Sequence, residues 1–511
     1  MTAPLIGIDV STTGVKACAW HPDGHCIDEA RASLALQRPG PHRYEQDPED
    51  WWVAVCRVLR ALGERLPVAP AALAIAHQRE TFVASGDDGS PLHPALLWLD
   101  RRGEPWVKRL HEGFPAEAMR ACSGKSPNYG PAFYKLAWLA EARPGIFGSL
   151  AMVCDVQAWL ARRLTGRAVT SWTGADPLGL FDIRHMEWSA ELCERVGLRT
   201  DQLPGVVAPG TRIGGLSRDA ASATGMPAGT PLVAAGGDGQ MGGLAVDALD
   251  NGRLYLNLGT AVVAGAWSSA PAVSPAWRTL TAGAGEGYYL ESSLRSGALL
   301  SDWLLKRVVG LDPVADAAVL ERLEAEAAAL PPGGYGALLL PYWEGVMNPH
   351  WDDAARGAIL GLSDADGRAS LYRALIEGVA LEQAGFVSAL RVEAGVVAHE
   401  AVATGGPAGS DLWCRIHADA IGVPVRRQPG LEAAALGAAI CAACGVGLYP
   451  DLASAARAMA PAGGDVFTPD PDNQAFYARL RGIHGRIHER MAPLMHELEA
   501  ALAGQNPLHR A

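Results

Sequence analysis

Two short turns rich in small residues carry the strongest chemical signal in this chain. Each turn follows an apolar segment and leads into a second one, so the pattern strand, turn, strand occurs twice. Backbone N–H groups and hydroxyls, with no bulky side chains between them, form a wall of donors that fits the oxygens of a polyphosphate. We therefore predict two facing nucleotide-binding turns. The first contains Ser11, Thr12, Thr13 and Gly14, followed by Lys16, and the second contains Gly259 and Thr260.

Asp9 ends the first apolar segment, directly before the first turn. A carboxylate beside phosphate is unfavourable unless a cation lies between them, so its expected task is to hold Mg²⁺ against the phosphates. A turn-capping aspartate is the ordinary alternative. The second turn, which makes a phosphate site more plausible, favours the metal role.

Asp238 lies in the segment GGDGQ, where the neighbouring glycines allow a small molecule to approach the backbone closely. Phosphoryl transfer to an alcohol needs alignment, charge stabilisation and one acceptor for the hydroxyl proton. Asp238 is therefore the candidate general base. An N-cap of a helix that begins near Met241 is an alternative compatible with the same spacing.

Polar side chains at two other strand ends suit a polyhydroxyl substrate, which is recognised through paired hydrogen bonds and an aromatic wall. A salt-bridged surface is the alternative for these residues. The predicted substrate contacts are Gln78, Arg79, Glu80, Trp98, Asp100 and Asp238.

A further turn, in ATGGPAGSDLW, offers bare backbone at Gly405 and Gly406 on which adenine could lie. An ordinary strand-to-helix turn would have the same sequence pattern.

The elements that position these residues follow from hydrophobic periodicity and turn signals. The first half reads as strands at 5–10, 26–36 and 73–77, with a helix that begins at Asp47-Pro48. This order predicts a mixed sheet with helices on its faces. In the second half we predict helices at about 368–394, 410–421, 432–445 and 471–503. A turn signal at Asp250-Asn251-Gly252 places the domain boundary there, giving domains 1–250 and 251–511.

Composition narrows the class of protein. The chain has 511 residues and 49% apolar content, enough for two large cores. A net charge of −12 without a basic cluster argues against nucleic acid as a partner. The sequence shows no apolar run of about 20 residues and no leader pattern, so we expect a cytoplasmic protein without a membrane partner. Nine scattered cysteines indicate core residues rather than disulfides.

With these pieces in place, the chain resembles the FGGY family of carbohydrate kinases over nearly its whole length. The resemblance rests on the order and spacing of its motifs. They are GIDVSTTGVKA from residue 7, HPALLWLDRR from 93, YKLAWL from 134, GGDGQMGG from 236, LNLGTAVV from 256, LLLPYWEGVMNPHWDDAARGAILGLS from 338, IEGVALE from 376 and ATGGPAGSDLW from 403.

The resemblance implies an α/β fold of two ribonuclease-H-like domains, of the actin, hexokinase and heat-shock ATPase type, around a central cleft. It implies ATP and Mg²⁺ as cofactors, Asp238 as general base and Asp9 in the metal and phosphate region. It also implies that Gly259, Thr260, Gly405 and Gly406 line the nucleotide. A homodimer is the family-level expectation.

Within the family the chain is most similar to xylulokinases, which implies transfer of the γ-phosphate of ATP to D-xylulose. Three departures bear on the acceptor and the first turn. Gln78-Arg79-Glu80-Thr81 resembles the polyol-binding segment of glycerol kinases, Gly239 replaces the usual Asn or Gln, and Ser11 replaces a usual Gly. A kinase of glycerol, erythritol or another polyol or ketose is the alternative, and an actin-like or chaperone-like ATP-driven protein is a remote one.

Overall fold

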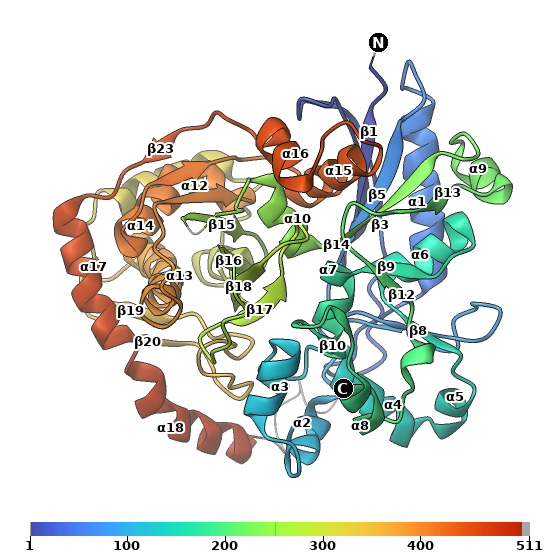
Figure 1. Ribbon diagram of the computed structural model, residues 1–511. Coiled ribbons are helices and arrows are strands. Elements are labelled where there is room, and N and C mark those ends of the chain that lie inside the picture. Colours follow the sequence, from blue (N-terminus) through green and yellow to red (C-terminus); the bar gives the residue numbers. More distant parts are fainter. Residues whose placement is uncertain (1, 251, 503–511) are drawn as a thin grey trace.

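Residues 2–250 and 252–502 are described by a computed structural model, in which two α/β halves lie side by side (Figure 1). Each half is built on one mixed sheet with helices packed on both of its faces. Among the described residues, no helix combines the length and the apolar character needed to cross a bilayer. The two-domain α/β class predicted from the sequence is confirmed.

The first sheet has the strand order β13-β14-β5-β1-β2-β3, and the second has the order β17-β18-β16-β15-β21-β22-β23. The strands of the first sheet are β1 (Leu5–Val10), β2 (Gly14–Trp20), β3 (Cys26–Ser33), β5 (Ala72–His77), β13 (Arg212–Gly215) and β14 (Pro231–Gly237). Those of the second are β15 (Arg253–Leu258), β16 (Val262–Ser268), β17 (Arg278–Thr281), β18 (Tyr288–Leu294), β21 (Glu400–Thr404), β22 (Val425–Arg427) and β23 (Val466–Phe467).

Short strand pairs flank the sheets: β4 (Glu45–Gln46) with β7 (Ala95–Leu96), β6 (Val83–Ser85) with β8 (Met152–Cys154), β9 (Val169–Ser171) with β12 (Gly205–Val207), β10 (Phe181–Asp182) with β11 (Glu187–Trp188), and β19 (Leu338–Leu340) with β20 (Ala358–Leu360). The helices of the first half are α1 (Pro48–Gly63), α2 (Glu104–His111), α3 (Ala116–Ser123), α4 (Ala132–Ala142), α5 (Pro144–Gly148), α6 (Val156–Thr165), α7 (Trp172–Ala175), α8 (Ala190–Arg195), α9 (Arg218–Thr224) and α10 (Asp238–Ala245). Those of the second are α11 (Ala298–Trp303), α12 (Ala317–Ala328), α13 (Arg368–Ala389), α14 (Asp411–Ile421), α15 (Ala433–Gly445), α16 (Leu452–Met459), α17 (Pro471–His484) and α18 (Ile487–Leu502).

The two sheets repeat one topology. In the first, β1 forms an antiparallel hairpin with β2 and pairs in parallel with β5, which in turn pairs in parallel with β14. In the second, β15 forms the hairpin with β16 and pairs in parallel with β21, followed by β22. The duplication inferred from the two turns is therefore present in the strand order. It brings the carboxyl ends of the parallel strands of both sheets toward the region between the halves.

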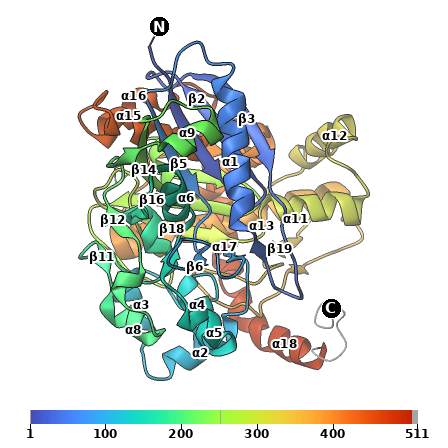
Figure 2. The same ribbon diagram turned by 90° about the vertical axis from the view of Figure 1, so that its right-hand side faces the viewer.

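The first sheet is buried on both faces. On one face, α1 and α6 cover it through a core that includes Trp51, Leu59 and Trp159 (Figure 2). On the other face lie α10, α15 and α16, whose apolar side chains pack against those of β1, β5 and β14. The strands β1 and β5 are accordingly apolar along nearly their whole length, as expected for central parallel strands.

Helix α15 comes late in the chain but packs on the sheet of the first half. The approach is close because two glycines lack side chains: a Cβ at Gly7 would lie 1.8 Å from the carbonyl oxygen of Ala435, and one at Gly437 would lie 2.1 Å from that of Met241. A division into 1–250 and 251–511 therefore describes the order along the chain, while residues 433–459 share a core with the first sheet. Asn251, in the predicted boundary turn, lies outside the described residues.

Two predicted boundaries are wrong. The helix expected at 471–503 is two helices, α17 and α18, separated by Gly485 and Arg486, and residue 503 lies outside the described part of the chain. The helix expected near Met241 begins earlier, at Asp238, and its N-cap is Gly237. The Asp238 side chain is therefore not an N-cap, and it remains free to act on a ligand.

Candidate functional site

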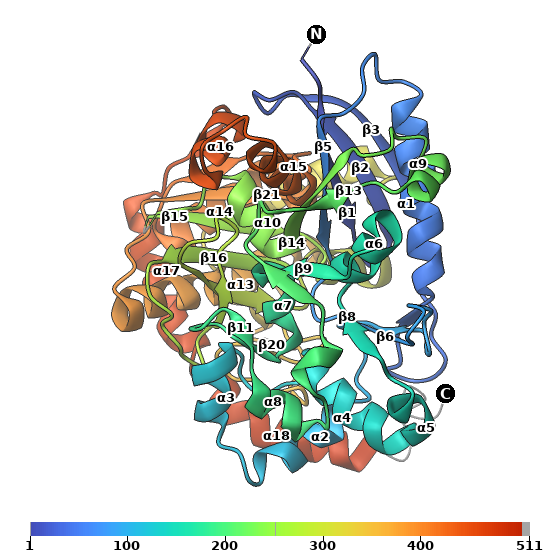
Figure 3. The same cartoon turned by 45° about the vertical axis from the view of Figure 1, so that its right-hand side comes forward.

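One cavity of about 280 Å³ lies between the two halves, where parallel strands of both sheets end. Figure 3 shows α10 and α15 beside β14 in this central region. Ligands of open α/β sheets bind in this position, beyond the carboxyl ends of the strands. The cavity is lined by residues of both halves: Asp9, Arg79, Asp238, Gly239, Gly242 and Val246 from the first, and Tyr255, Asn257, Val263, Thr404, Gly405, Leu431, Glu432, Ala433 and Ala434 from the second.

Asp9 reaches this cavity from the penultimate position of β1, opposite Ala76 of the parallel strand β5. Its Oδ1 atom is buried and accepts no hydrogen bond from the described residues. Burial, with the nearby charges of Asp238 and Glu432, raises the pKa of Asp9 to about 7, although Lys16 opposes the shift. An orphaned carboxylate oxygen facing a cavity is the arrangement that a divalent cation would satisfy.

Asp238 is the first residue of α10 and comes directly after β14, whose end lies beside His77 of β5 in the sheet. Its side chain is 42% exposed, its Oδ1 accepts from the backbone N–H of Gly239, and the same atom lies 3.1 Å from Nε of Arg79. The carboxylate is thus accessible from the cavity and oriented by one guanidinium and one backbone donor. A group in this setting is able to accept a proton from a bound hydroxyl.

Arg79 belongs to a series of alternating charges that links side chains of the two halves. Its Nη1 donates to both carboxylate oxygens of Glu291, at 3.0 and 2.9 Å. Glu291 also accepts from Arg278, and Nη1 of Arg278 donates to Oε1 of Glu80 at 2.9 Å. The carboxylates of Glu291 and Asp238 outweigh burial and hold the pKa of Arg79 above its ordinary value. The series therefore runs Asp238, Arg79, Glu291, Arg278, Glu80.

The glycines around Asp238 leave room for Arg79. A Cβ at Gly239 would lie 2.9 Å from the Cζ, Nη1 and Nη2 atoms of Arg79, and a Cβ at Gly237 would lie 2.7 Å from its Cγ. Real Cβ atoms do not approach neighbours this closely without a shift. The Arg79 guanidinium packed against residue 239 thus explains the glycine at this position, where the family that the sequence resembles usually has Asn or Gln.

The other predicted acceptor residues lie near the end of β5 but do not line the cavity. The Thr12 hydroxyl donates to Oε1 of Gln78 at 3.0 Å and accepts from Nε1 of Trp98 at 2.9 Å. Glu80 is buried and has a positive φ of 62°. Asp100 is fully buried, where it pairs with Arg102 and accepts from the backbone of Tyr44. Asp100 therefore fixes the local chain rather than facing the cavity.

The first predicted phosphate turn closes on itself at the end of β1, whereas the second is hydrogen-bonded to the start of α11 and the residue before it. Ser11 donates through both its backbone N–H and its hydroxyl to the carbonyl of Gly14, each at 2.9 Å, while Thr13 is exposed. In the second turn, the carbonyls of Gly259 and Thr260 accept from the N–H groups of Ala298 and Gly297.

Glycine is required at Gly405, because its φ is 88° and a Cβ there would lie 2.4 Å from the carbonyl oxygen of Leu258. Gly405 lines the cavity. Gly406 does not line it, and nothing lies within 4 Å of a Cβ built at Gly406.

Lys16, which was predicted to contact the nucleotide, forms an ion pair with Glu432. Glu432 immediately precedes α15 and belongs to the cavity wall together with Ala433 and Ala434. The positive end of a helix dipole and a lysine thus meet at one side of the cavity, which favours an anion there. In the structure, this lysine is paired with the carboxylate of Glu432.

Sequence reasoning missed four ionisable residues of the cavity wall and of the charge network: Tyr255, Arg278, Glu291 and Glu432. A signal for Glu291 exists in the segment YYLESSL, where a single charge interrupts an otherwise buried strand. A buried charge needs a partner, so such a residue is a candidate for an ion pair. The sequence does not identify the partners of Glu291, because they depend on which strands lie side by side in the tertiary structure.

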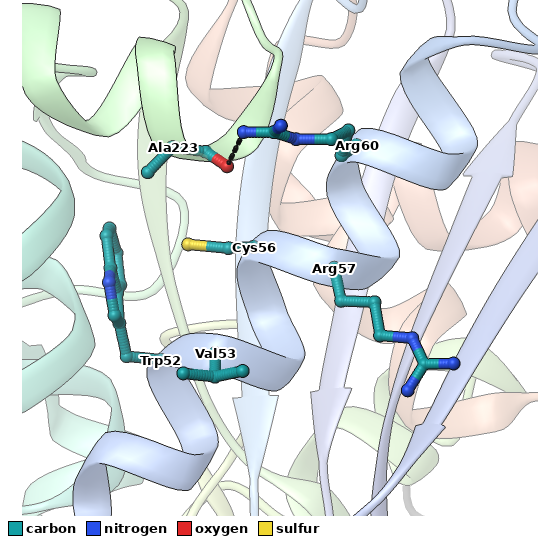
Figure 4. Close-up of a pocket in the computed structure, with 6 residues that line it drawn as sticks. All are labelled: Trp52, Val53, Cys56, Arg57, Arg60 and Ala223. Atoms are coloured by element: carbon teal, nitrogen blue, oxygen red, sulfur yellow. Dashed lines mark hydrogen bonds between the residues drawn. The ribbon is translucent and has the colours of Figure 1, made fainter.

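A second hollow lies on the outer face of α1, away from the strand ends (Figure 4). It is shallow and bordered by α1 and by Ala223, whose carbonyl oxygen accepts from Nη2 of Arg60 at 2.7 Å. None of the predicted site residues lines it. Its wall also lacks a carboxylate and a small-residue turn, the features that mark the cavity between the halves.

Comparison with known proteins identifies the family. Residues 5–245 match the N-terminal domain of the FGGY family of carbohydrate kinases, and residues 254–446 match its C-terminal domain. A glycerol kinase of Aromatoleum aromaticum is 34% identical over 468 residues, covering 87% of this chain and 90% of the relative. A xylulose kinase of Escherichia coli is 29% identical over 501 residues, covering 96% and 99%.

A solved xylulose kinase from Lactobacillus acidophilus has the same fold, with a TM-score of 0.90 at 23% identity, covering 97% of this chain and 100% of that one. The two family matches together span most of the sequence, in the order that the two repeated sheets require. Enzymes of this family transfer phosphate to an alcohol group of a carbohydrate. The chain belongs to the FGGY family of carbohydrate kinases.

Proposed function

We propose that this sugar kinase transfers the γ-phosphate of ATP to a terminal hydroxyl of a ketopentose, with D-xylulose as the leading acceptor. The observation that carries the proposal is the placement of Asp238. Its exposed carboxylate faces a cavity that also holds Asp9 and Gly405, so a base, a cation ligand and a bare nucleotide-facing turn share one space.

In the proposed reaction, Asp238 accepts the proton of the acceptor hydroxyl as its oxygen attacks the γ-phosphorus of ATP. The bond from phosphorus to the bridging oxygen of ADP then breaks, and the leaving oxygen keeps the electron pair. Arg79 orients both the acceptor and the base. Because phosphoryl transfer asks for little covalent work from the protein, this alignment is the main contribution of the chain.

The residues around Asp9 fit a bound Mg²⁺ ion. Asp9 offers an oxygen atom without a donor, at the end of the strand that leads into the first phosphate turn. When bound, Mg²⁺ would supply neutralisation of the phosphate charge. Lys16, which is paired with Asp9 across the β1–β2 hairpin, would serve the same purpose once released from Glu432.

Glycerol is the second candidate acceptor, and one observation favours it. Arg79 and Glu80, which resemble the polyol-binding segment of glycerol kinases, belong to the same charge network as Asp238. The relative from Aromatoleum aromaticum named a glycerol kinase supports this candidate, as the Escherichia coli relative supports D-xylulose.

A panel of acceptors assayed by ADP release decides between them. We expect D-xylulose to give a kcat/KM at least tenfold above those of L-xylulose, D-ribulose, erythritol and glycerol, because only the true acceptor aligns its terminal hydroxyl with Asp238. NMR of the product should place the phosphate at the terminal position. A higher kcat/KM for glycerol would overturn D-xylulose in favour of the second candidate, and no turnover with any acceptor would overturn both.

A further inference from the structure

Glu291 belongs to the second half of the chain, yet its carboxylate holds an arginine of the acceptor site in the first half. We propose that Glu291 is a positioning residue for phosphoryl transfer, which fixes Arg79 and, through Arg79, the carboxylate of Asp238. The inference rests on the proposed roles of Arg79 and Asp238. It adds that the second half contributes to orienting the acceptor end of the reaction.

The first step of the argument is the geometry of the Arg79 guanidinium. Nη1 donates to both oxygens of Glu291, while Nε lies 3.1 Å from Oδ1 of Asp238. A guanidinium is rigid and planar, so fixing one of its nitrogens on a carboxylate restricts where the others point. Rotation of Arg79 away from Glu291 would therefore carry Nε away from Asp238.

The second step is that Glu291 itself has a fixed position. It is fully buried, and it lies opposite Arg278 across the antiparallel pair β17 and β18. It accepts from Arg278 and, at 2.9 Å, from the hydroxyl of Tyr255. Arg79 and Arg278 outweigh burial and hold the pKa of Glu291 below its ordinary value, so the carboxylate is ionised at neutral pH. The anchor is thus rigid and charged.

The third step is the surroundings of Arg79 on its other side. There the side chain packs against Gly237 and Gly239, which offer it backbone and space but no side chain. These glycines limit where Arg79 lies without supplying a charged partner that would set its orientation. Within the described structure, Glu291 supplies two of the contacts of this guanidinium and Asp238 supplies a third.

Because Glu291 comes from β18, the orientation of Arg79 depends on the relative placement of the two halves. The contact is made in the structure, and a movement of one half away from the other would weaken it. The alignment of the base would then be coupled to the closed state, in which water is excluded and wasteful ATP hydrolysis is suppressed.

The variant Glu291→Gln tests the proposal, with D-xylulose as acceptor, or glycerol if the panel favours it. The amide keeps the shape but loses the charge and one acceptor for Arg79. We expect kcat/KM for the acceptor to fall about 10- to 100-fold, the range for losing one charged hydrogen bond that orients a reacting group. The KM for ATP should change less than twofold.

Glu377→Gln is the matched control. Glu377 is equally buried, and it accepts from an arginine and a tyrosine, Arg373 and Tyr477, but it lies in α13 away from the cavity. We expect it to lower the melting temperature as much as Glu291→Gln does while leaving kcat/KM for the acceptor within twofold of wild type. An equal loss of acceptor kcat/KM in both variants would mean that Glu291 is merely structural, and would overturn the proposal.

A double-mutant cycle separates an effect through Arg79 from any other. In an Arg79→Gln background, Glu291→Gln should change the residual kcat/KM less than twofold, because the positioned group is already gone. A cost equal to that in the wild-type background would overturn the proposal. If Glu291→Gln fails to fold, Tyr255→Phe, which removes one donor to Glu291, replaces it with the same expected direction and about a three- to tenfold effect.

A readout without acceptor separates this inference from the proposed function. Crystal structures of unliganded Glu291→Gln and Glu377→Gln should show Arg79 displaced from Asp238 in the first only. If no acceptor is phosphorylated, the proposed function fails, and the structures still decide the positioning role. An unmoved Arg79 in Glu291→Gln would refute it.

Discussion

At the scale of single residues, two aspartates face one cavity in different surroundings. Asp9 has a buried oxygen that accepts no hydrogen bond from the described residues and lies near two other carboxylates, whereas Asp238 is held by Arg79 and a backbone N–H. The first environment disfavours a lone negative charge and invites a cation. The second holds a carboxylate at the cavity wall, as the proposed general base requires. Similar residues thus acquire separate tasks from their neighbours.

Asp238→Asn should lower kcat by about three orders of magnitude or more, because the amide keeps the shape but cannot accept the proton. ATP affinity, measured by calorimetry, should stay within about threefold of wild type. Asp219→Asn, at an exposed first-turn position of α9 in the same half, is the control and should retain full activity. Near-normal turnover of Asp238→Asn would remove the general base from the proposal.

Asp9→Asn should stabilise the protein at high pH in the absence of Mg²⁺. With a folded pKa of about 7 against an ordinary 3.8, the folded state binds the proton more tightly, so stability falls as pH rises from about 4 to 7. The amide lacks this penalty. Urea unfolding should show a gain of about 1–3 kcal/mol at pH 8 that vanishes near pH 4.

Asp28→Asn is the control of opposite sign. Its pairing with Arg65 holds the pKa of Asp28 below the ordinary value, so its contribution to stability is present above pH 4 and is lost on acidification. That variant should be less stable than wild type at pH 8. A constant difference between Asp9→Asn and wild type at all pH values would contradict the raised pKa.

Gly239→Ala should impair the acceptor step while sparing the fold. Its methyl group would lie 2.9 Å from the Arg79 guanidinium, which must then move from Asp238. We expect about a tenfold or larger loss in kcat/KM for the acceptor, with little change in melting temperature because a flexible side chain yields. Gly145→Ala, in α5 outside the cavity wall and with nothing within 4 Å of its Cβ, should be neutral.

At the scale of elements, α15 shows how closely a helix can lie on backbone when glycines face it. Its Gly437 contacts the carbonyl of Met241 in α10, and Gly7 of β1 contacts the carbonyl of Ala435. The apolar, alanine-rich composition of α15 allows burial on all sides. Small residues here bring the two helices and the sheet together, and they place the start of α15 at the cavity.

Gly437→Ala should destabilise the protein by more than about 3 kcal/mol, although alanine is the better helix former, because overpacking against backbone cannot be relieved by a rotamer change. Gly385→Ala, in the C-terminal part of α13 with nothing within 4 Å of its Cβ, should instead gain up to about 1 kcal/mol. Chemical denaturation of both variants measures the difference. Equal effects of the two substitutions would contradict the packing of α15 on α10.

The local sequence pattern predicted helices and strands well. It did not predict contacts between residues that are far apart in the sequence. Strand β1 and helices α14 and α15 follow their predicted bounds closely, because their apolar periodicity and caps are local. The network of Glu291 and Arg278 was not predicted, because it depends on the register of β17 against β18 and on the contact of both with the first half. The pairing of Asp100 with Arg102 and with the backbone of Tyr44 was likewise not predicted, because residue spacing does not show it.

At the scale of the whole molecule, the halves are joined by shared cores as well as by the chain. Residues 433–459 belong by sequence to the second half and by packing to the first. The charge chain from Asp238 to Glu80 crosses the same divide near the cavity. Motion of one half against the other must therefore keep α15 on its sheet and change contacts around the cavity.

Residues 2–250 expressed alone should fail to form a native-like unit, because one apolar face of the first sheet would be uncovered. We expect dye binding to exposed apolar surface and weak amide protection. Addition of a peptide spanning residues 431–460 should raise protection of β1 and β5. A fully protected isolated fragment would contradict the dependence of this sheet on α15.

The late position of α15 has a consequence for biosynthesis. At ribosomal elongation rates of about 5–20 residues per second, roughly 10–40 s separate the emergence of the first 250 residues from that of the helix that shields them. During this interval the nascent polypeptide exposes the apolar face of the first sheet that α15 later covers. We therefore expect the yield of the folded enzyme in cells to depend on chaperones that bind unfolded chains at the ribosome.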